Sequence, residues 1–132
     1  MKVLFVSRTW ADMPKTPVIE QADALAKYCN IEVQHFFIRK GGIKGYFKAA
    51  RELSEFIKSQ RIDIVHAHYG TSAFAVVISK LFFYNRYKLV VTFHGSDVLL
   101  RSELKYSMVA ARFSSHNILV SEKMLQFFHG KF

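Results

Sequence analysis

The sequence predicts an α/β fold, a Rossmann-like parallel sheet of about five strands with helices on both faces. Short apolar runs bounded by polar loops recur along its 132 residues, as in strands that are covered on both faces. Each run is followed by a longer segment whose apolar residues recur at helical spacing. No internal repeat, linker or low-complexity segment interrupts this alternation, so residues 1–132 are expected to form a single domain.

The first half of the chain is expected to contain three strands separated by two helices. Apolar runs predict strands at residues 3–7, 32–38 and 63–68. Thr16 can cap a helix, and Pro17 is tolerated at the first helical position because its missing N–H would have no partner there. The apolar face of this first helix comprises Val18, Ala22, Leu25 and Cys29.

A second helix is expected after the loop at residues 39–42. Its apolar residues recur at helical spacing, so they are expected to face the core. They are Ile43, Phe47, Ala50, Leu53, Phe56 and Ile57. The next helix, at residues 71–84, is almost entirely apolar, which predicts that it is buried.

The second half of the chain continues the strand–helix pattern. Strands are predicted at residues 89–94 and 117–120, with a helix at about 101–113 between them. A last helix is expected over residues 122–128. Gly130 is typical of a C-terminal stop, because glycine tolerates the left-handed conformation that often ends a helix.

The composition is that of a basic globular protein. Half of the residues (51%) are apolar, which excludes a disordered acidic chain. Nineteen basic and ten acidic residues give a formal charge of +9, which indicates an anionic partner such as nucleic acid, a membrane surface or a phosphorylated ligand. Nucleic acid is not expected as a partner, because no recognition helix or aromatic RNA-binding motif is present.

The sequence indicates a cytoplasmic protein. Cys29 is its only cysteine, which excludes an internal disulfide, and its place on an apolar helix face predicts a core residue rather than a nucleophile. The apolar run at residues 3–6 is too short for a signal peptide. The longest apolar region, residues 73–84, is interrupted by Ser79 and Lys80 and falls short of the roughly 18 residues of a spanning helix. Peripheral attachment to a membrane stays open.

The basic residues are concentrated in one segment. Between residues 39 and 51 there are five of them and no acidic residue: Arg39, Lys40, Lys44, Lys48 and Arg51. They accompany Ile43, Tyr46 and Phe47 on an amphipathic segment. One interpretation is attachment to the anionic inner face of a membrane, since each basic residue near such a surface contributes about 1 kcal/mol. The other is a solvated helix face that only aids solubility.

Polar and aromatic side chains gather where the predicted strands end. Open parallel sheets bind ligands outside the carboxyl ends of their strands, so these residues are candidates for a binding site. Besides His94, they are Arg8, Trp10, His68, Tyr69, Gly95, Ser96, Asp97 and Ser121. Three of the six histidines, His66, His68 and His94, lie at this edge, and this clustering is the main indication of function.

Residues 94–97, which read HGSD, combine four useful groups. They offer an imidazole that titrates near neutrality, a glycine that permits close backbone approach, a hydroxyl and a carboxylate. Together these groups could orient a polar ligand and assist a proton transfer. The alternative is a glycine turn before the next helix, with Ser96 or Asp97 as its N-cap.

A metal or nucleotide cofactor is not expected. His66 and His68 are two residues apart, so they share one face of a strand and could form a three-histidine metal site with His94. The favoured alternative is that one histidine packs internally while the other lines the cleft, because no glutamate accompanies them. The loop after the first strand lacks the glycine pattern of dinucleotide sites, and no P-loop occurs.

Several blocks of the sequence together resemble the N-terminal domain of family 4 (group 1) glycosyltransferases. They are DIVHAHYG at 63–70, VVTFHGSDV at 90–98, AAR at 110–112 with ILVS at 118–121, and EQADAL at 20–25. Their order and spacing are similar to those of the family over residues 2–125, nearly the whole chain. The combination of blocks, rather than any single one, carries the resemblance.

The resemblance implies half of a GT-B enzyme, in which two Rossmann-like domains enclose the active site between them. The N-terminal domain of such enzymes holds the acceptor, and the C-terminal domain holds a nucleotide-diphosphate sugar. Most members retain the anomeric configuration and need no metal. By this resemblance His94 would be the catalytic residue that contacts the donor sugar, Ser96 and Asp97 would lie beside it, and the loop at residues 8–15 would face the acceptor.

The sequence departs from the family pattern in two respects. Many members carry a glycine pair in the first loop, whereas residues 13–17 here read MPKTP, so the resemblance does not extend to donor contacts through that loop. The donor-binding C-terminal domain is absent from residues 1–132, which therefore resemble a truncated N-terminal domain. We expect this chain to be inactive alone and, within a longer enzyme, to serve sugar transfer to a polysaccharide or lipid-linked acceptor. The alternative is a non-catalytic subunit of a split glycosyltransferase that binds a membrane or a partner.

Overall fold

A sheet of five parallel strands forms the centre of the molecule. The computed structural model describes residues 1–9 and 16–128, and within them the strands lie in the order β2-β1-β3-β4-β5. The strands are β1 (Lys2–Arg8), β2 (Glu32–Ile38), β3 (Ile64–His68), β4 (Lys88–Phe93) and β5 (His116–Leu119). All four neighbouring pairs are parallel, as the alternation of strands and helices predicts.

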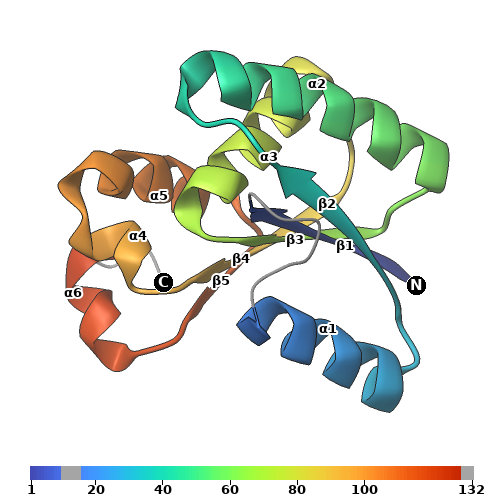
Figure 1. Ribbon diagram of the computed structural model, residues 1–132, viewed down its shortest axis with the longest axis horizontal. Helices are drawn as coiled ribbons and strands as arrows, with labels where there is room; N and C mark the ends of the chain where they lie inside the picture. Colours follow the sequence, from blue (N-terminus) through green and yellow to red (C-terminus); the bar gives the residue numbers. More distant parts are fainter. Residues whose placement is uncertain (10–15, 129–132) are drawn as a thin grey trace.

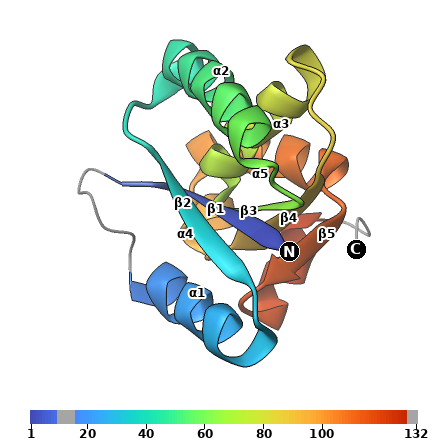
Figure 2. The ribbon, with the colours of Figure 1, turned by 90° about the vertical axis from the view of Figure 1, so that its right-hand side faces the viewer.

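Helices connect these strands and cover both faces of the sheet. They are α1 (Thr16–Cys29), α2 (Gly42–Gln60), α3 (Gly70–Phe82), α4 (Ser96–Leu99), α5 (Arg101–Phe113), a 3₁₀ helix (Glu122–Met124) and α6 (Leu125–Phe128). Figures 1 and 2 show α2 and α3 together on one side of the sheet and α1 on the other. The expected arrangement of helices on both faces is therefore confirmed.

The strand order explains why α1 lies apart from α2 and α3. The chain moves from β1 outward to β2 through α1, and then back across β1 to β3 through α2. Parallel crossovers are right-handed, so connections that run in opposite directions along a sheet place their helices on opposite faces. The sheet thus has a switch point between β1 and β3, because the connections that follow these two strands run in opposite directions along the sheet.

Alternation along the strands supplies a core on each face. Leu4 and Val6 of β1 are fully buried in the larger cluster, which also includes the buried residues of α2 and α3. Val3 and Phe5 face the other way and pack against residues of α1, among them Val18. Burial of apolar side chains on both faces contributes most of the stability of such a fold.

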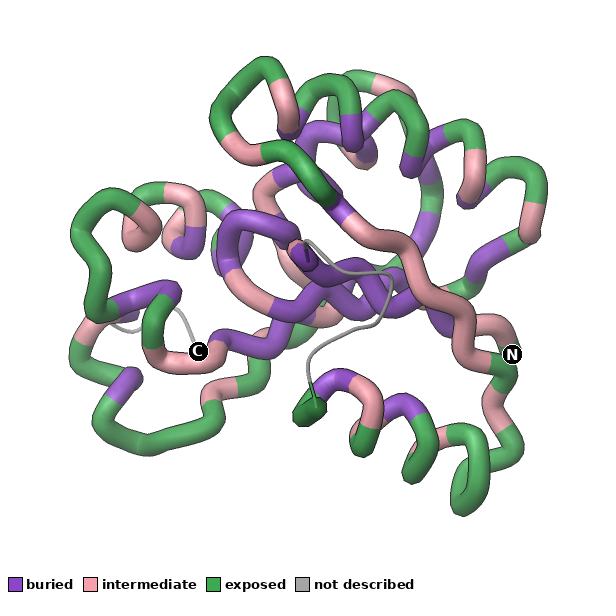
Figure 3. The backbone as a smooth tube through the Cα atoms, viewed as in Figure 1, coloured by how far each residue is buried: buried purple, intermediate pink, exposed green. Residues whose placement is uncertain are grey.

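The apolar helix α3 lies in the middle of its layer. It contacts α2, α5 and three strands, and its first ten residues contain nine that are buried. Figure 3 shows α3 mostly buried, whereas α1, on the opposite face of the sheet, has an exposed outer side. The expectation of a buried helix is confirmed for Gly70–Ser79, whereas Leu81 and Phe82 at its end are exposed.

Two expectations about helix faces are wrong. Cys29 is exposed rather than in the core, because only Val18 and Ala22 of α1 are buried and the helix has turned its last residues outward. Ile43 and Phe47 are 60% and 42% exposed. The buried face of α2 is instead rotated by about one residue and begins at Tyr46, where the helix meets α3 and α5.

Element boundaries differ from the expected ones by only one or two residues in most cases. The exceptions lie in the second half, where Ser96–Leu99 form the separate short helix α4 and the last predicted helix divides into a 3₁₀ helix and α6. Gly130, the expected stop, lies outside the described residues. Among the described helices, none combines the length and apolar character that a bilayer span requires.

Candidate active site

The best-formed candidate site lies at the carboxyl ends of β1, β3 and β4. In sheets of this strand order, ligands bind at the switch point, which here is the end of β1 and β3. Arg8 ends β1, Tyr69 follows β3, and His94 follows β4. The parallel register of β1 with β3 and of β3 with β4 brings these three residues to the same edge of the sheet.

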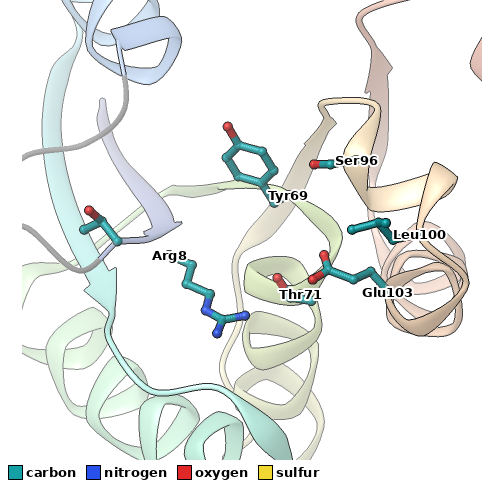
Figure 4. A pocket seen from close by; sticks show the side chains of 7 residues that line it. Arg8, Tyr69, Thr71, Ser96, Leu100 and Glu103 are labelled. Carbon is teal, nitrogen blue, oxygen red and sulfur yellow. The ribbon is translucent and has the colours of Figure 1, made fainter.

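A pocket of about 260 Å³ opens at this edge, between the ends of β1 and α3 on one side and α4 and α5 on the other. Figure 4 shows Arg8 entering it from β1, Tyr69 and Thr71 from the start of α3, and Ser96 and Glu103 from the opposite side. Ligand sites typically measure roughly 300–1,000 Å³. The pocket by itself therefore encloses only part of a ligand of ordinary size.

Charged and hydroxyl groups line this pocket, and three of its residues, Arg8, Thr71 and Glu103, interact with the buried Tyr46. The hydroxyl of the buried Tyr46 interacts with Thr71 and lies within the electrostatic reach of Arg8 and Glu103. Burial raises the pKa of Tyr46, and the positive charge of Arg8 opposes that shift. Arg8 also lies against Gly41, where a side-chain carbon would meet its guanidinium group. The pocket can thus offer one cation, one carboxylate and several hydroxyl groups to a polar ligand.

Tyr69 occupies an unusual backbone conformation at the start of α3. Its φ of 72° and ψ of 143° lie in a region that side-chain-bearing residues rarely adopt. Its N–H donates to the carbonyl of Thr92 at 3.0 Å, which ties the end of β3 to β4. Its ring stacks on that of His94, with a centroid separation of 4.4 Å and an interplanar angle of 28°. Strained residues of this kind concentrate at functional sites.

The HGSD loop is held by its own carboxylate. Asp97 is fully buried, and its Oδ2 accepts a hydrogen bond from the backbone N–H of His94 at 2.8 Å. Gly95 has a φ of 86°, which favours glycine, and it is the residue before α4. The structure shows no side-chain N-cap for α4, so the alternative in which Ser96 or Asp97 caps this helix is wrong. The loop instead holds the His94 ring against Tyr69 and places Ser96 in the lining of the pocket.

Three histidine rings lie in a row beneath this loop. His66 and His68 stack with centroids 4.5 Å apart, and Nδ1 of His68 lies 3.2 Å from Nε2 of His94. At the other end of the row, Nε2 of His66 hydrogen-bonds the hydroxyl of Thr92 at 2.8 Å. The ring of Phe5 packs against both His66 and His68, with ring centroids 4.8 Å apart in each case, and so adds an apolar neighbour to both.

Burial keeps the inner histidines neutral. It lowers the pKa of His66 to about 4, and the nearby His94 adds to the effect. Burial and the neighbouring histidines lower the pKa of His68 to about 2. Three ring nitrogens of this row take part in hydrogen bonds with other side chains, and the described residues contain no group of three histidine, cysteine or acidic side chains arranged to hold a metal ion.

The structure brings most of the expected site residues together in two groups. Arg8, Tyr69 and Ser96 line the pocket. His68 and His94 belong to the row of histidines, whose outer ring, that of His94, stacks on the ring of Tyr69. Gly95 and Asp97 shape the loop between the two groups.

One other expected residue, Ser121, is not part of either group. Ser121 is exposed at the start of the 3₁₀ helix, where its hydroxyl accepts a hydrogen bond from the N–H of Lys123. It does not line the pocket. Trp10 lies outside the described residues. The proposal that Ser121 binds substrate therefore has no support from its position.

Thr9, which belongs to the loop at residues 8–15, also lines the pocket, and so do three residues that the sequence did not single out: Thr71, Leu100 and Glu103. Thr71 follows the end of β3 within a few residues, so the strand-end rule could have included it. Leu100 and Glu103 belong to the junction of α4 and α5. Nothing in the local sequence indicates that this junction folds back over the end of β3.

A comparison with known families identifies the chain. The sequence model described as Glycosyltransferase Family 4 matches residues 2–132. The chain belongs to glycosyltransferase family 4. A search of curated proteins finds no significant match to this sequence.

A solved structure supports the fold of this family 4 chain. The crystal structure of HepE from Anabaena in complex with UDP superposes with a TM-score of 0.66 at 17% sequence identity. The match covers 97% of this chain and 40% of the HepE chain, so the family 4 chain spans less than half of that protein's length. The expected fold, a Rossmann-like α/β domain that corresponds to half of a GT-B glycosyltransferase, is confirmed.

Proposed function

We propose that this family 4 domain forms the acceptor side of a glycosyltransferase that moves a sugar from a nucleotide-diphosphate donor to a polysaccharide or lipid-linked acceptor with retention of configuration. The observation that carries the proposal is the stack of His94 on Tyr69 beside a pocket at the switch point of the sheet. The position of this pair at the carboxyl ends of β3 and β4 supports the proposal, because open α/β sheets bind ligands at that edge. UDP in the HepE structure supports a uridine nucleotide as one donor class to test.

His94 is the proposed catalytic residue. It is half-buried, its backbone is fixed by Asp97, and its ring is held between Tyr69 and His68. A ring fixed between two neighbours loses little freedom when a ligand binds, so it can position a sugar hydroxyl or exchange a proton with it. No metal or further cofactor is part of this proposal, and the donor domain would supply the charges that stabilise the departing diphosphate.

The replacement of His94 by alanine tests this proposal. In the proposed two-domain enzyme, His94→Ala is expected to lower kcat tens-fold or more, which is the scale of a positioning or acid–base residue. Transfer of radiolabelled sugar from UDP- and GDP-sugars measures the effect. Ser121→Ala is the matched control, because Ser121 is polar and lies at a strand end but outside the pocket. Near-normal turnover of His94→Ala would remove His94 from the site.

A second candidate function, attachment to an anionic membrane, is favoured by one surface feature. The exposed rings of Phe47 on α2 and Phe82 on α3 lie 5.5 Å apart, and Ile43 is exposed one turn earlier. Lys40 and Lys44 lie beside this apolar group on the chain and are exposed. An apolar patch with lysines around it is typical of a surface that enters the headgroup region of a bilayer.

The charges of the basic segment are not equivalent in this role. Lys48 and Arg51 form surface ion pairs with Glu52 and Glu55, at 3.9 and 3.5 Å. Each acidic residue lies one helical turn after its basic partner, and the two compensate part of the charge of the segment. Lys40 and Lys44 are therefore expected to contribute more to membrane attraction than Lys48 and Arg51.

Co-sedimentation with vesicles tests the membrane proposal. We expect the chain to bind vesicles with anionic lipid and to lose most of this binding when Phe47 and Phe82 are both replaced by serine. Lys40→Gln with Lys44→Gln should weaken binding several-fold, because each lysine contributes about 1 kcal/mol. Lys58→Gln, at the far end of the same helix, is the matched control. Equal binding by all variants would exclude attachment through this patch.

A further inference from the structure

His68 is a buried polar residue that does not line the pocket, so ligand binding in the pocket does not account for it. It is fully buried, and it lies between the rings of Phe5, His66 and His94. It does not line the pocket, so a direct contact with a ligand would require its neighbours to move. Its only hydrogen-bonding neighbour among the described residues is Nε2 of His94, 3.2 Å from its own Nδ1.

This single contact dictates complementary roles for the two rings. A neutral imidazole has one N–H donor and one bare nitrogen that accepts. Burial and the adjacent histidines hold the pKa of His68 far below neutrality, so His68 carries one proton in the folded chain. Of the two facing nitrogens, one must therefore donate and the other must accept.

The far nitrogen of His68 indicates which ring donates. Nε2 of His68 is buried and has no hydrogen-bond partner among the described residues. If Nε2 carried the proton, an N–H donor would be buried without an acceptor, which folded proteins rarely tolerate. If Nδ1 carries the proton, Nε2 is a bare acceptor nitrogen, and no N–H donor is left without a partner. His68 Nδ1–H then donates to Nε2 of His94, and the proton of neutral His94 must be on Nδ1.

We propose that His68 is a positioning residue that fixes the ring plane and the tautomer of His94, so that neutral His94 carries its proton on Nδ1. His68 acts from behind, while Tyr69 packs on the face of the same ring. Any proton that neutral His94 offers to a ligand is then the one on Nδ1. The link to sugar transfer rests on the proposed function of His94, whereas the tautomer itself is a property of the isolated chain.

The packing argues against a purely structural role for His68. An apolar side chain of similar size would fill the space between Phe5 and His66 without a buried nitrogen that lacks a partner. A residue that breaks a local packing rule is expected mainly where function requires it. His68→Phe should accordingly leave the fold intact while it removes the hydrogen bond to His94.

Nitrogen NMR of histidine-labelled chain tests the proposal. At pH 8, where neutral rings are observed, the wild-type spectrum should show His94 protonated on Nδ1. His68→Phe should lose this preference, and His68→Asn should restore it, because the asparagine amide can donate from near the position of Nδ1. His66→Gln is the matched control: it replaces another ring of the row but keeps a donor for Thr92. Circular dichroism confirms that each variant is folded.

The outcomes separate this proposal from the function of the enzyme. Wild-type His94 protonated on Nε2 would overturn it, whether or not any variant folds, and so would an unchanged tautomer in His68→Phe. In the two-domain enzyme, we expect His68→Phe to lower kcat several-fold with KM unchanged and His68→Asn to recover most of it. If His94 is protonated on Nδ1 but the wild-type enzyme transfers no sugar, His68 remains a positioning residue and the proposed function is contradicted.

Discussion

His66 and His68 are buried in the folded chain but exposed to water when it unfolds, and this difference couples folding to pH. A histidine in the unfolded chain has a pKa near 6.5, whereas burial lowers the pKa of His66 to about 4 and that of His68 to about 2. Between those values and 6.5 the unfolded chain binds protons that the folded chain does not. The stability contribution is therefore complete above pH 6.5 and is lost as the pH falls.

We expect each of these two histidines to reduce the free energy of unfolding by about 2 kcal/mol between pH 7.5 and 5, in addition to the smaller effect of carboxylates. Urea denaturation at several pH values measures the slope. His66→Gln should remove about half of it, since the amide keeps a hydrogen bond to Thr92 but does not titrate. An equal slope in the variant would show that His66 does not remain neutral in the folded chain.

The contact of α3 with α5 determines where Tyr69 and the HGSD loop lie relative to each other. Gly70, the first residue of α3, has no space for a side chain, because an added carbon would overlap Ser107 of α5. The Ser107 hydroxyl donates to the carbonyl of Asp97 at 2.9 Å, so the same contact reaches the loop that carries His94. These two helices therefore set the distance between the two sides of the pocket.

Gly70→Ala is expected to destabilise the chain by roughly 1–3 kcal/mol, because the extra methyl group forces α3 and α5 apart. Thermal unfolding gives the loss of stability, and the NMR signals of Tyr69 and His94 report the displaced site. Ser107→Ala is the matched control, since it removes only the hydrogen bond to Asp97 and should cost about 1 kcal/mol. A stable Gly70→Ala chain with unchanged signals at Tyr69 would contradict this account of the helix contact.

At the scale of the whole molecule, the pocket offers little positive charge for the proposed sugar transfer. Its volume is about 260 Å³, and of its described lining residues only Arg8 is cationic, with the carboxylate of Glu103 across from it. A departing nucleoside diphosphate carries several negative charges, and its stabilisation is usually a large part of catalysis. One arginine opposite a glutamate cannot supply that charge.

The 132-residue chain alone is therefore expected to transfer no sugar from any nucleotide donor. A panel of UDP- and GDP-sugars, with radiolabel counted in acceptor and in free sugar, measures this. The two-domain enzyme assayed under the same conditions is the positive control. Turnover by the isolated chain would show that the site is complete within residues 1–132 and would refute the proposed dependence on a donor domain.

The secondary structure of this chain could be predicted from its sequence because its signals are local. Apolar runs in strands such as β3 and the apolar length of α3 depend on residues that are near in sequence, and the order of these elements predicted the parallel sheet. The strand-end rule then brought Arg8, Tyr69, Ser96 and His94 to one edge, because parallel strands all end on the same side.

The sequence by itself thus determined the order of the elements, the class of fold and the edge at which the site lies. Only the tertiary structure decided that Ile43, Phe47 and Cys29 are exposed, that Glu103 reaches the pocket, and that His68 faces His94 rather than solvent. The physical reason is the range of the interactions. Helical and strand periodicity repeats over a few residues, whereas the rotation of a helix on the sheet and the pairing of two rings 26 residues apart are set by packing between distant segments.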